Sequence, residues 1–329
     1  MVARELELFK KNIPTMGSDP EVFVVRGKRE TVFPAWEFLP SKEDGGEVGP
    51  FWDGFQGEWN TQPTPATKSP LEGIKLGLQR ILGAAKAKDP TARLSLKSVV
   101  NIPKMVMRKA PEFGVRLGCS PSKNAYGLRG KPVENPYELG VRFAGMHLHI
   151  GCSELDVNFE HLTKMLDGVL GVAGVTLAQG LDDPVRRQFY GLAGEYRLPK
   201  HGLEYRVLSN FPLAHPAIAD LVFELAYMAV CWNRMGVNLS MLGPEGVVQE
   251  IINNSDVALA RGWIEKNWKF YETYFQARYG NGYWEPNPWK TNKTRKALLE
   301  GIGAVVETPG DLEENWRVFH TWKTFGVGI

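Results

Sequence analysis

The chain has 329 residues, of which 43% are hydrophobic and 23% charged, an ordinary globular composition that allows one large domain or two smaller ones. The formal net charge is +2 and no basic block stands out, so nucleic acid is not an expected partner. The three cysteines are widely spaced and form no Cys-x-x-Cys motif, which favours a reducing compartment over disulfides or zinc. The N-terminus lacks the apolar core of a signal peptide, and the most apolar later run, residues 217–232, contains two acidic residues. We therefore expect a cytoplasmic protein without a membrane span.

The first predicted strand covers residues 21–25, and its polar face begins just before it. Asp19 and Glu21 are two residues apart and fall on one face of an extended chain, opposite Pro20, Val22 and Val24. A turn and a return strand over residues 30–33 follow. Residues 40–54 are rich in glycine, proline and acids and predict a loop over a site. Asp53 in this loop is a candidate for a further metal ligand, although acidic loop residues are usually just solvated.

The same alternation returns over residues 52–60, which predict the next strand. Here Glu58 and Asn60 lie two residues apart, opposite Gly57 and Trp59. A polar pair at strand spacing with an apolar face behind it therefore occurs for a second time.

A helix is predicted over residues 70–87, where apolar residues recur at helical spacing. Residues 69–72, Ser-Pro-Leu-Glu, form a capping box with proline at the first helical position. We expect this helix to cover the back of the sheet. Between it and residue 140 the sequence predicts only two short strands, at 99–100 and 113–117.

Residues 141–151, Val-Arg-Phe-Ala-Gly-Met-His-Leu-His-Ile-Gly, predict a strand with two histidines on one face. His147 and His149 share this face with two glycines, and Met146, Leu148 and Ile150 form the apolar opposite face. Two imidazoles beside open positions suit a metal or phosphate site, whereas the alternative is a hydrogen-bonded histidine pair in a solvated sheet.

A long helix over 157–180 and a short one over 182–190 lead to two copies of Glu-Tyr-Arg, at 195–197 and 204–206. We favour the second copy as catalytic because Val207 and Leu208 continue its strand pattern. Its polar pair is Glu204 and Arg206. Arg187 and Arg197 nearby are candidates for binding phosphate or a substrate carboxylate, although such arginines are more often solvated or paired.

From residue 213 onward the sequence predicts helices, at 214–235, 244–252, 255–278, 291–303 and 309–320. We therefore divide the chain into a sheet domain, residues 1–212, and a helical C-terminal part, residues 213–329. Residues 263–289 are dense in aromatics, which favours packing of this part on the sheet over a binding platform.

Four strands with polar pairs place a cluster of side chains on one face if they share a sheet. Carboxylates crowded together repel one another strongly at low dielectric unless cations are present. Hard oxygen ligands with imidazole and arginine indicate Mg²⁺ or Mn²⁺ holding a polyphosphate. The residues concerned are Asp19, Glu21, Glu58, His147, His149, Glu204 and Arg206.

The order acid-x-Glu, Glu, Gly-Met-His-x-His and Glu-x-Arg resembles glutamine synthetase and the glutamate–cysteine ligases. Residues 15–210 are more closely similar to the phage-type carboxylate–amine ligases (amidoligases, type 2), through the segments 17–21, 118–119, 142–151 and 204–209. Ser122 departs from the family's Gly-Cys-x-Pro-Asp segment, where an aspartate is expected. A phage-encoded protein would act in the host cytoplasm.

The resemblance implies an α+β fold with a glutamine synthetase-like antiparallel sheet, whose concave face holds the site and whose back carries helices. It implies amide or peptide bond formation that depends on ATP and Mg²⁺ (or Mn²⁺), through an acyl phosphate. The carboxylate and amine substrates would be amino acids, peptides or protein side chains. Glu21, Glu58, His147 and Glu204 would bind metal, with Asp19 in the place of a glutamate. His149 and Arg206 would bind the transferring phosphoryl group.

Four other classes of protein share part of this pattern. A zinc amidohydrolase carries its His-x-His near the N-terminus of a barrel, which does not fit a pair at residue 147. A Walker-type kinase is excluded because the sequence lacks Gly-x-x-x-x-Gly-Lys-Ser/Thr. A phosphagen-kinase-like phosphotransferase and a non-catalytic binding protein that retains the fold stay open as alternatives.

Overall fold

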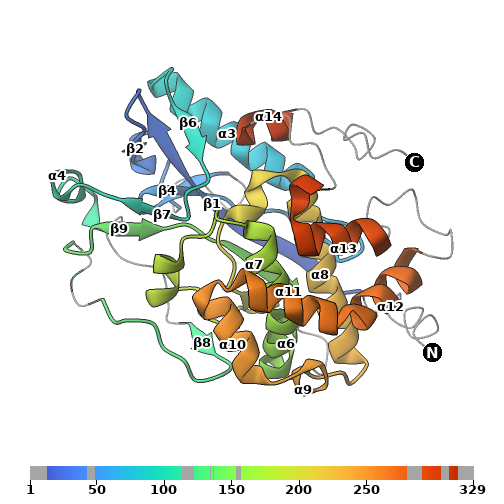
Figure 1. Cartoon of the computed structure of the whole chain (residues 1–329). Helices are drawn as coiled ribbons and strands as arrows, with labels where there is room; N and C mark the ends of the chain where they lie inside the picture. Colours follow the sequence, from blue (N-terminus) through green and yellow to red (C-terminus); the bar gives the residue numbers. More distant parts are fainter. Residues whose placement is uncertain are drawn as a thin grey trace.

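The computed structural model describes residues 13–42, 49–112, 122–133, 135, 137–152, 157–279, 291–304 and 311–317. In these ranges, helices cover one face of a large antiparallel sheet, and they lie in front of it in Figure 1. This arrangement confirms the predicted α+β fold with helices at the back of the sheet. None of the helices in the described ranges is long and apolar enough to cross a membrane.

Ten of the described strands form one sheet, whose main path runs β3-β4-β1-β10-β12-β11-β8 with antiparallel neighbours. The strands on this path are β1 (Thr15–Arg26), β3 (Phe51–Asp53), β4 (Gln56–Glu58), β8 (Lys123–Asn124), β10 (Met146–Gly151), β11 (Glu195–Arg197) and β12 (Gly202–Tyr205). Three further strands pair with β1: β2 (Thr31–Phe33), β5 (Thr64–Pro65) and β6 (Arg93–Ser95). β7 (Val99–Asn101) and β9 (Val141–Phe143) form a separate pair, which confirms the strand predicted at 99–100.

The back of the sheet is apolar and packs on helices, as the alternation in β10 predicts. Met146, Leu148 and Ile150 are at most 1% exposed and belong to the main core. The helical elements of this layer include α6 (Phe159–Leu166), η2 (Asp167–Gly171), α7 (Val172–Ala178) and α8 (Pro216–Arg234). Burial of this face leaves the polar face of the same strands free to form a site.

The helix predicted over residues 157–180 is present, but its middle, η2, is a π-helical turn. A π turn leaves carbonyl groups without their usual helical partners. Two aromatic side chains supply donors: Trp263 Nε1 donates to Gly168 O at 2.9 Å, and the Tyr271 hydroxyl donates to Val169 O at 3.0 Å. The C-terminal aromatics in the described ranges are therefore packing groups, as predicted.

Helix α3 (Leu71–Lys88) confirms the prediction over residues 70–87, but the predicted capping box is wrong. Pro70 is the N-cap residue and no side chain caps the helix. The Ser69 hydroxyl instead donates to Asp220 Oδ1 at 2.5 Å and so ties the start of α3 to α8. A tertiary hydrogen bond has replaced the local one that the motif predicts.

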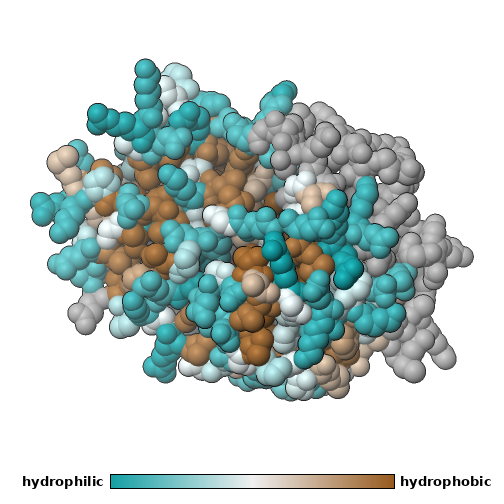
Figure 2. Space-filling view, in the orientation of Figure 1, coloured by the Kyte–Doolittle hydropathy of each residue, from teal (hydrophilic) through white to brown (hydrophobic). Residues whose placement is uncertain are grey.

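The C-terminal helices are α9 (Leu239–Leu242), α10 (Glu245–Asn254), α11 (Val257–Lys266), α12 (Trp268–Tyr279), α13 (Thr291–Glu300) and α14 (Leu312–Arg317). The single helix predicted over 255–278 is divided at Asn267, which caps α11 and donates through Nδ2 to Trp263 O at 3.0 Å. Figure 2 shows hydrophilic and hydrophobic residues interspersed over the face where α10 and α11 lie. The boundary at residue 212 stays a prediction.

The remaining elements are short: α4 (Lys104–Met107) and the 3₁₀ turns η1 (Ala35–Glu37), η3 (Pro184–Gln188), η4 (Phe211–Ala214) and η5 (Ile302–Ala304). η3 takes the place of the short helix predicted over 182–190. The strand predicted at 113–117, the Gly-Cys pair at 118–119 and part of the loop at 40–54 lie outside the described residues.

Candidate active site

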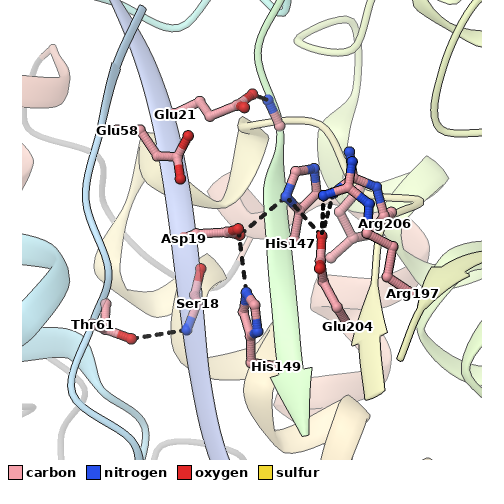
Figure 3. Close-up of polar contacts among 12 residues, drawn as sticks. Ser18, Asp19, Glu21, Glu58, Thr61, His147, His149, Arg197, Glu204 and Arg206 are labelled. Carbon is pink, nitrogen blue, oxygen red and sulfur yellow. Dashed lines mark hydrogen bonds and ion pairs between the residues drawn. The ribbon is translucent and has the colours of Figure 1, made fainter. Parts of the chain in front are cut away.

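The register of the sheet brings the predicted polar pairs together on one face. Asp19 on β1 lies opposite His147 on β10, and Glu21 lies opposite Glu58 on β4. Glu204 on β12 is the partner of both His149 and Arg197. Directly opposed residues of an antiparallel pair project to the same face. Figure 3 shows these side chains converging from neighbouring strands.

Three carboxylates form an acidic cluster at one end of this face: Glu21, Asp53 and Glu58. One ligand oxygen of each lies within 4.8 Å of the others. Burial and then the charge of Asp53 raise the pKa of Glu21 to about 8, and the same two causes raise the pKa of Glu58 well above its usual range. Burial also raises the pKa of Asp53. Without a cation the cluster therefore holds protons at neutral pH, and a bound cation would displace them.

A second group, the histidine cluster, consists of Asp19, His147 and Glu204, again with ligand atoms within 4.8 Å of one another. His147 Nδ1 lies 3.1 Å from Asp19 Oδ1 and 3.7 Å from Glu204 Oε1. Apart from this mutual contact, neither Asp19 Oδ1 nor His147 Nδ1 has a hydrogen-bond partner among the described residues. Burial, and then the charge of Arg206, lower the pKa of His147 to about 4, so its ring is neutral at pH 7. A neutral imidazole nitrogen facing two carboxylates fits a metal site.

His149 extends the histidine cluster toward the surface. Its Nε2 lies 3.2 Å from Asp19 Oδ2, and its Nδ1 forms a hydrogen bond with His201 Nε2 at 2.9 Å. Burial by itself would lower the pKa of His149, but the contact with Asp19 outweighs burial and raises it.

Two arginines approach Glu204 from the other end of the face. Arg206 Nη1 donates to Glu204 Oε1 in a close contact, and Arg197 Nη1 lies 3.6 Å from the same oxygen. The Nε atoms of both arginines are buried without a hydrogen-bond partner in the described ranges. Unpaired buried guanidinium donors are suited to an incoming anion.

A cavity of about 870 Å³ opens on this face. Its lining contains the acidic cluster, Asp19 and Glu195 together with cationic side chains, which are Lys42, Lys123, Arg129, Arg142, Arg197 and Arg206. A cavity that holds both cations and carboxylates of metal-ligand type suits a phosphate-bearing substrate bound with a metal ion. His149 and Glu204 stand beside the cavity rather than in its lining.

Arg187, a predicted phosphate ligand, lies outside the cavity lining and has other partners. Its Nη2 donates to Asp182 Oδ2 at 2.8 Å and its Nη1 to Val207 O at 2.6 Å. The side chains of Arg187 and Asp182 are both buried, and the bond from Arg187 to Val207 O holds the segment before β11 onto the chain after β12.

We expect replacement of Arg187 by alanine to lower the free energy of unfolding by about 3–5 kcal/mol, because a buried carboxylate would lose its partner. The matched variant Arg197→Ala should cost much less stability. Urea denaturation of the two variants checks this. Equal stability losses would show that Arg187 has no special structural role.

Three residues of the site, Asp53, Glu195 and Tyr190, have weak sequence signals or none. Asp53 joins the acidic cluster because β3 and β4 form a hairpin that places it opposite Gln56, on the face of Glu58. The Asp53-Gly54 dipeptide, with Gly54 at φ 63°, is typical of a hairpin turn, and this turn would have predicted that Asp53 lies on the face of Glu58. Glu195, from the first Glu-Tyr-Arg copy, is buried in the cavity wall and accepts from Gly191 N at 2.9 Å. Tyr190 carried no comparable sequence signal.

Residues 134–245 match the family model described as "Phage phiEco32-like COOH.NH2 ligase-type 2". The matched third of the chain contains β10, β11 and β12, with the histidines and arginines of the site, whereas the acidic strands β1, β3 and β4 precede it. A search of curated proteins gave no significant match. The fold, the site and this match support a carboxylate–amine ligase. More particularly, the chain is similar to the phage-type ligases of type 2, which confirms the resemblance seen in its motifs.

Proposed function

We propose that this protein is an ATP-dependent carboxylate–amine ligase that forms an amide or peptide bond through an acyl phosphate. The observation that carries this proposal is that two clusters of metal-ligand type lie on one sheet face with two arginines, Arg197 and Arg206, whose Nε atoms are buried and unpaired within the part of the chain that the structure describes. The family match over residues 134–245 supports the ligase class.

The residues present fit Mg²⁺ or Mn²⁺. Three carboxylates within 4.8 Å of one another, two of them buried and with the pKa of Glu21 raised to about 8, offer hard oxygen ligands that gain from a cation. Asp19, His147 and Glu204 offer a second set with one nitrogen. A bound cation would neutralise charge on the phosphates of ATP. Replacing Glu204 by glutamine would weaken the second set.

The chemistry requires the substrate carboxylate to attack the γ-phosphorus of ATP, so that a P–O bond forms and ADP leaves. The amine then attacks the acyl carbon, and inorganic phosphate leaves as the amide forms and a proton is lost. We assign Arg206 and Arg197 to the transferring phosphoryl group because each has an Nε donor that the described residues leave unpaired. We assign His149, whose Nε2 faces Asp19, to the same group, as the family resemblance implies. The protein contributes mainly positioning and charge stabilisation.

The phosphotransferase alternative shares the first step, and it differs in that the phosphorylated substrate would be the product. An acyl phosphate is reactive, so a ligase must exclude water until the amine arrives. Hydroxylamine, a small and strong nucleophile, intercepts such an intermediate as a hydroxamate.

We expect the protein, incubated with ATP, Mg²⁺, hydroxylamine and pooled amino acids or host metabolites, to form hydroxamates that mass spectrometry detects. ATP hydrolysis should be slow with the carboxylate alone and rise when the correct amine is added. A stable phosphorylated metabolite without hydroxamate would instead establish the phosphotransferase. Absence of both products, with no ATP turnover, would favour a binding protein.

A further inference from the structure

His147 is held at both ring nitrogens, and only one of them faces the histidine cluster. Its Nδ1 points to Asp19 and Glu204, as described above. Its Nε2 forms a close hydrogen bond with the hydroxyl of Tyr190, whose ring meets the imidazole edge-on at 89°. Because the two nitrogens have different partners, a flip of the ring would break the contact with Tyr190 and turn Nδ1 away from the carboxylates.

Tyr190 is itself fixed from several directions. It follows the 3₁₀ turn η3, and its backbone N–H donates to Arg186 O at 2.8 Å. Arg186 is fully buried and donates to Val207 O and Leu208 O at 3.0 and 2.7 Å, which locks the turn onto the chain after β12. The guanidinium of Arg186 also lies 4.4 Å from the Tyr190 ring centroid. The neighbouring Phe189 stacks on Phe143 at 5.5 Å.

Gly145 supplies an independent observation. A Cβ atom at this position would lie 3.1 Å from both His147 Nε2 and the Tyr190 hydroxyl, and 3.4 Å from Arg186 Nη2. Since real Cβ contacts are seldom so short, the missing side chain of residue 145 leaves room for this hydrogen bond. The glycine of the Gly-Met-His motif is therefore needed to leave space for the contact between His147 and Tyr190.

We propose that Tyr190 is a positioning residue for the metal site of the histidine cluster, an inference that rests on the proposed function. The Tyr190 oxygen accepts the Nε2–H of His147, which leaves the Nδ1 lone pair directed at a cation between Asp19 and Glu204. Metal-bound histidines generally donate their other N–H to such an outer partner, and losing that partner weakens metal binding about 10- to 100-fold. Tyr190 acts through His147 and is not assigned a step of its own.

The test is binding of Mn²⁺ alone to the full chain, followed by calorimetry and by electron spin echo modulation, which detects a coordinated imidazole nitrogen. We expect wild type to show nitrogen modulation and His147→Gln to lose it. Tyr190→Phe should bind Mn²⁺ at this site about 10- to 100-fold more weakly, with reduced modulation. Gly145→Ala, whose added methyl group would crowd the same hydrogen bond, should also bind Mn²⁺ more weakly and show reduced modulation.

Tyr271→Phe is the matched control, because it removes a buried hydroxyl that donates to Val169 O, outside the cavity lining. Circular dichroism and thermal melts establish that each variant is folded. The inference is overturned if Tyr190→Phe, folded, matches wild type in Mn²⁺ affinity and modulation while His147→Gln loses the modulation. If wild type binds no Mn²⁺, or His147→Gln keeps full modulation, the metal site of the proposed function fails, and the role of Tyr190 fails with it.

Discussion

Replacement of Arg206 by lysine is expected to lower turnover about 100- to 1,000-fold while leaving Mg²⁺ affinity within a few-fold of wild type. Lysine keeps the charge beside Glu204 but loses the planar set of donors that can hold two phosphoryl oxygens at once. The Arg206 guanidinium is buried and also lies 5.2 Å from the Tyr190 ring centroid, so its position is set by packing. The loss should therefore appear in phosphoryl transfer rather than in cation binding.

Steady-state kinetics of hydroxamate formation, with calorimetric titration of Mg²⁺, check this prediction. Arg26→Lys is a suitable control, since Arg26 pairs with Glu37 at 3.3 Å and does not line the cavity. Near-normal turnover of Arg206→Lys would mean that Arg206 serves as a structural partner of Glu204 and that another group binds the phosphoryl oxygens.

The polar face of the sheet was predictable because its signal is local. Side chains in a strand alternate between faces, so each polar pair was visible in a few residues of sequence, at 19 and 21 or at 147 and 149. The register that places Asp19 opposite His147 joins strands more than 120 residues apart, and it followed only from the assumption of one shared sheet. The structure shows that this assumption holds.

Residues outside the alternating strands were harder to predict, for physical reasons that differ. Tyr190 reaches His147 from a turn that the buried Arg186 anchors to backbone carbonyls, and such contacts leave no periodic pattern. Arg187 is adjacent in sequence to Arg186 and was predicted to bind phosphate. Its side chain instead pairs with Asp182, five residues earlier in the chain, and is directed into the protein interior. The charge of a residue does not by itself distinguish an arginine that binds a ligand from one that stabilises the fold through buried hydrogen bonds.

Cation binding to the acidic cluster is expected to weaken steeply as the pH falls below about 8. In the cation-free protein the pKa of Glu21 is raised to about 8, and those of Glu58 and Asp53 are also raised, so the cluster holds protons at neutral pH. A cation must displace them, and affinity then falls up to about tenfold per pH unit for each proton released.

The same shifts mean that the cation-free folded protein binds more protons than the unfolded chain above about pH 4.5. The contribution of these groups to the free energy of unfolding therefore declines as the pH rises toward 8.

Calorimetric titration of Mg²⁺ from pH 6 to 9, in buffers of different ionisation enthalpy, measures both the affinity and the number of protons released. Glu58→Gln should lose affinity at pH 8 and also show a shallower pH dependence, because one displaceable proton is gone. Glu245→Gln, which alters a surface pair with Lys164, should follow wild type. Added Mg²⁺ should raise the melting temperature of wild type more at pH 8.5 than at pH 6, since the repulsion that it relieves grows as the cluster ionises. An affinity that is constant over this range, with no protons released, would show that the three carboxylates are not the cation's ligands.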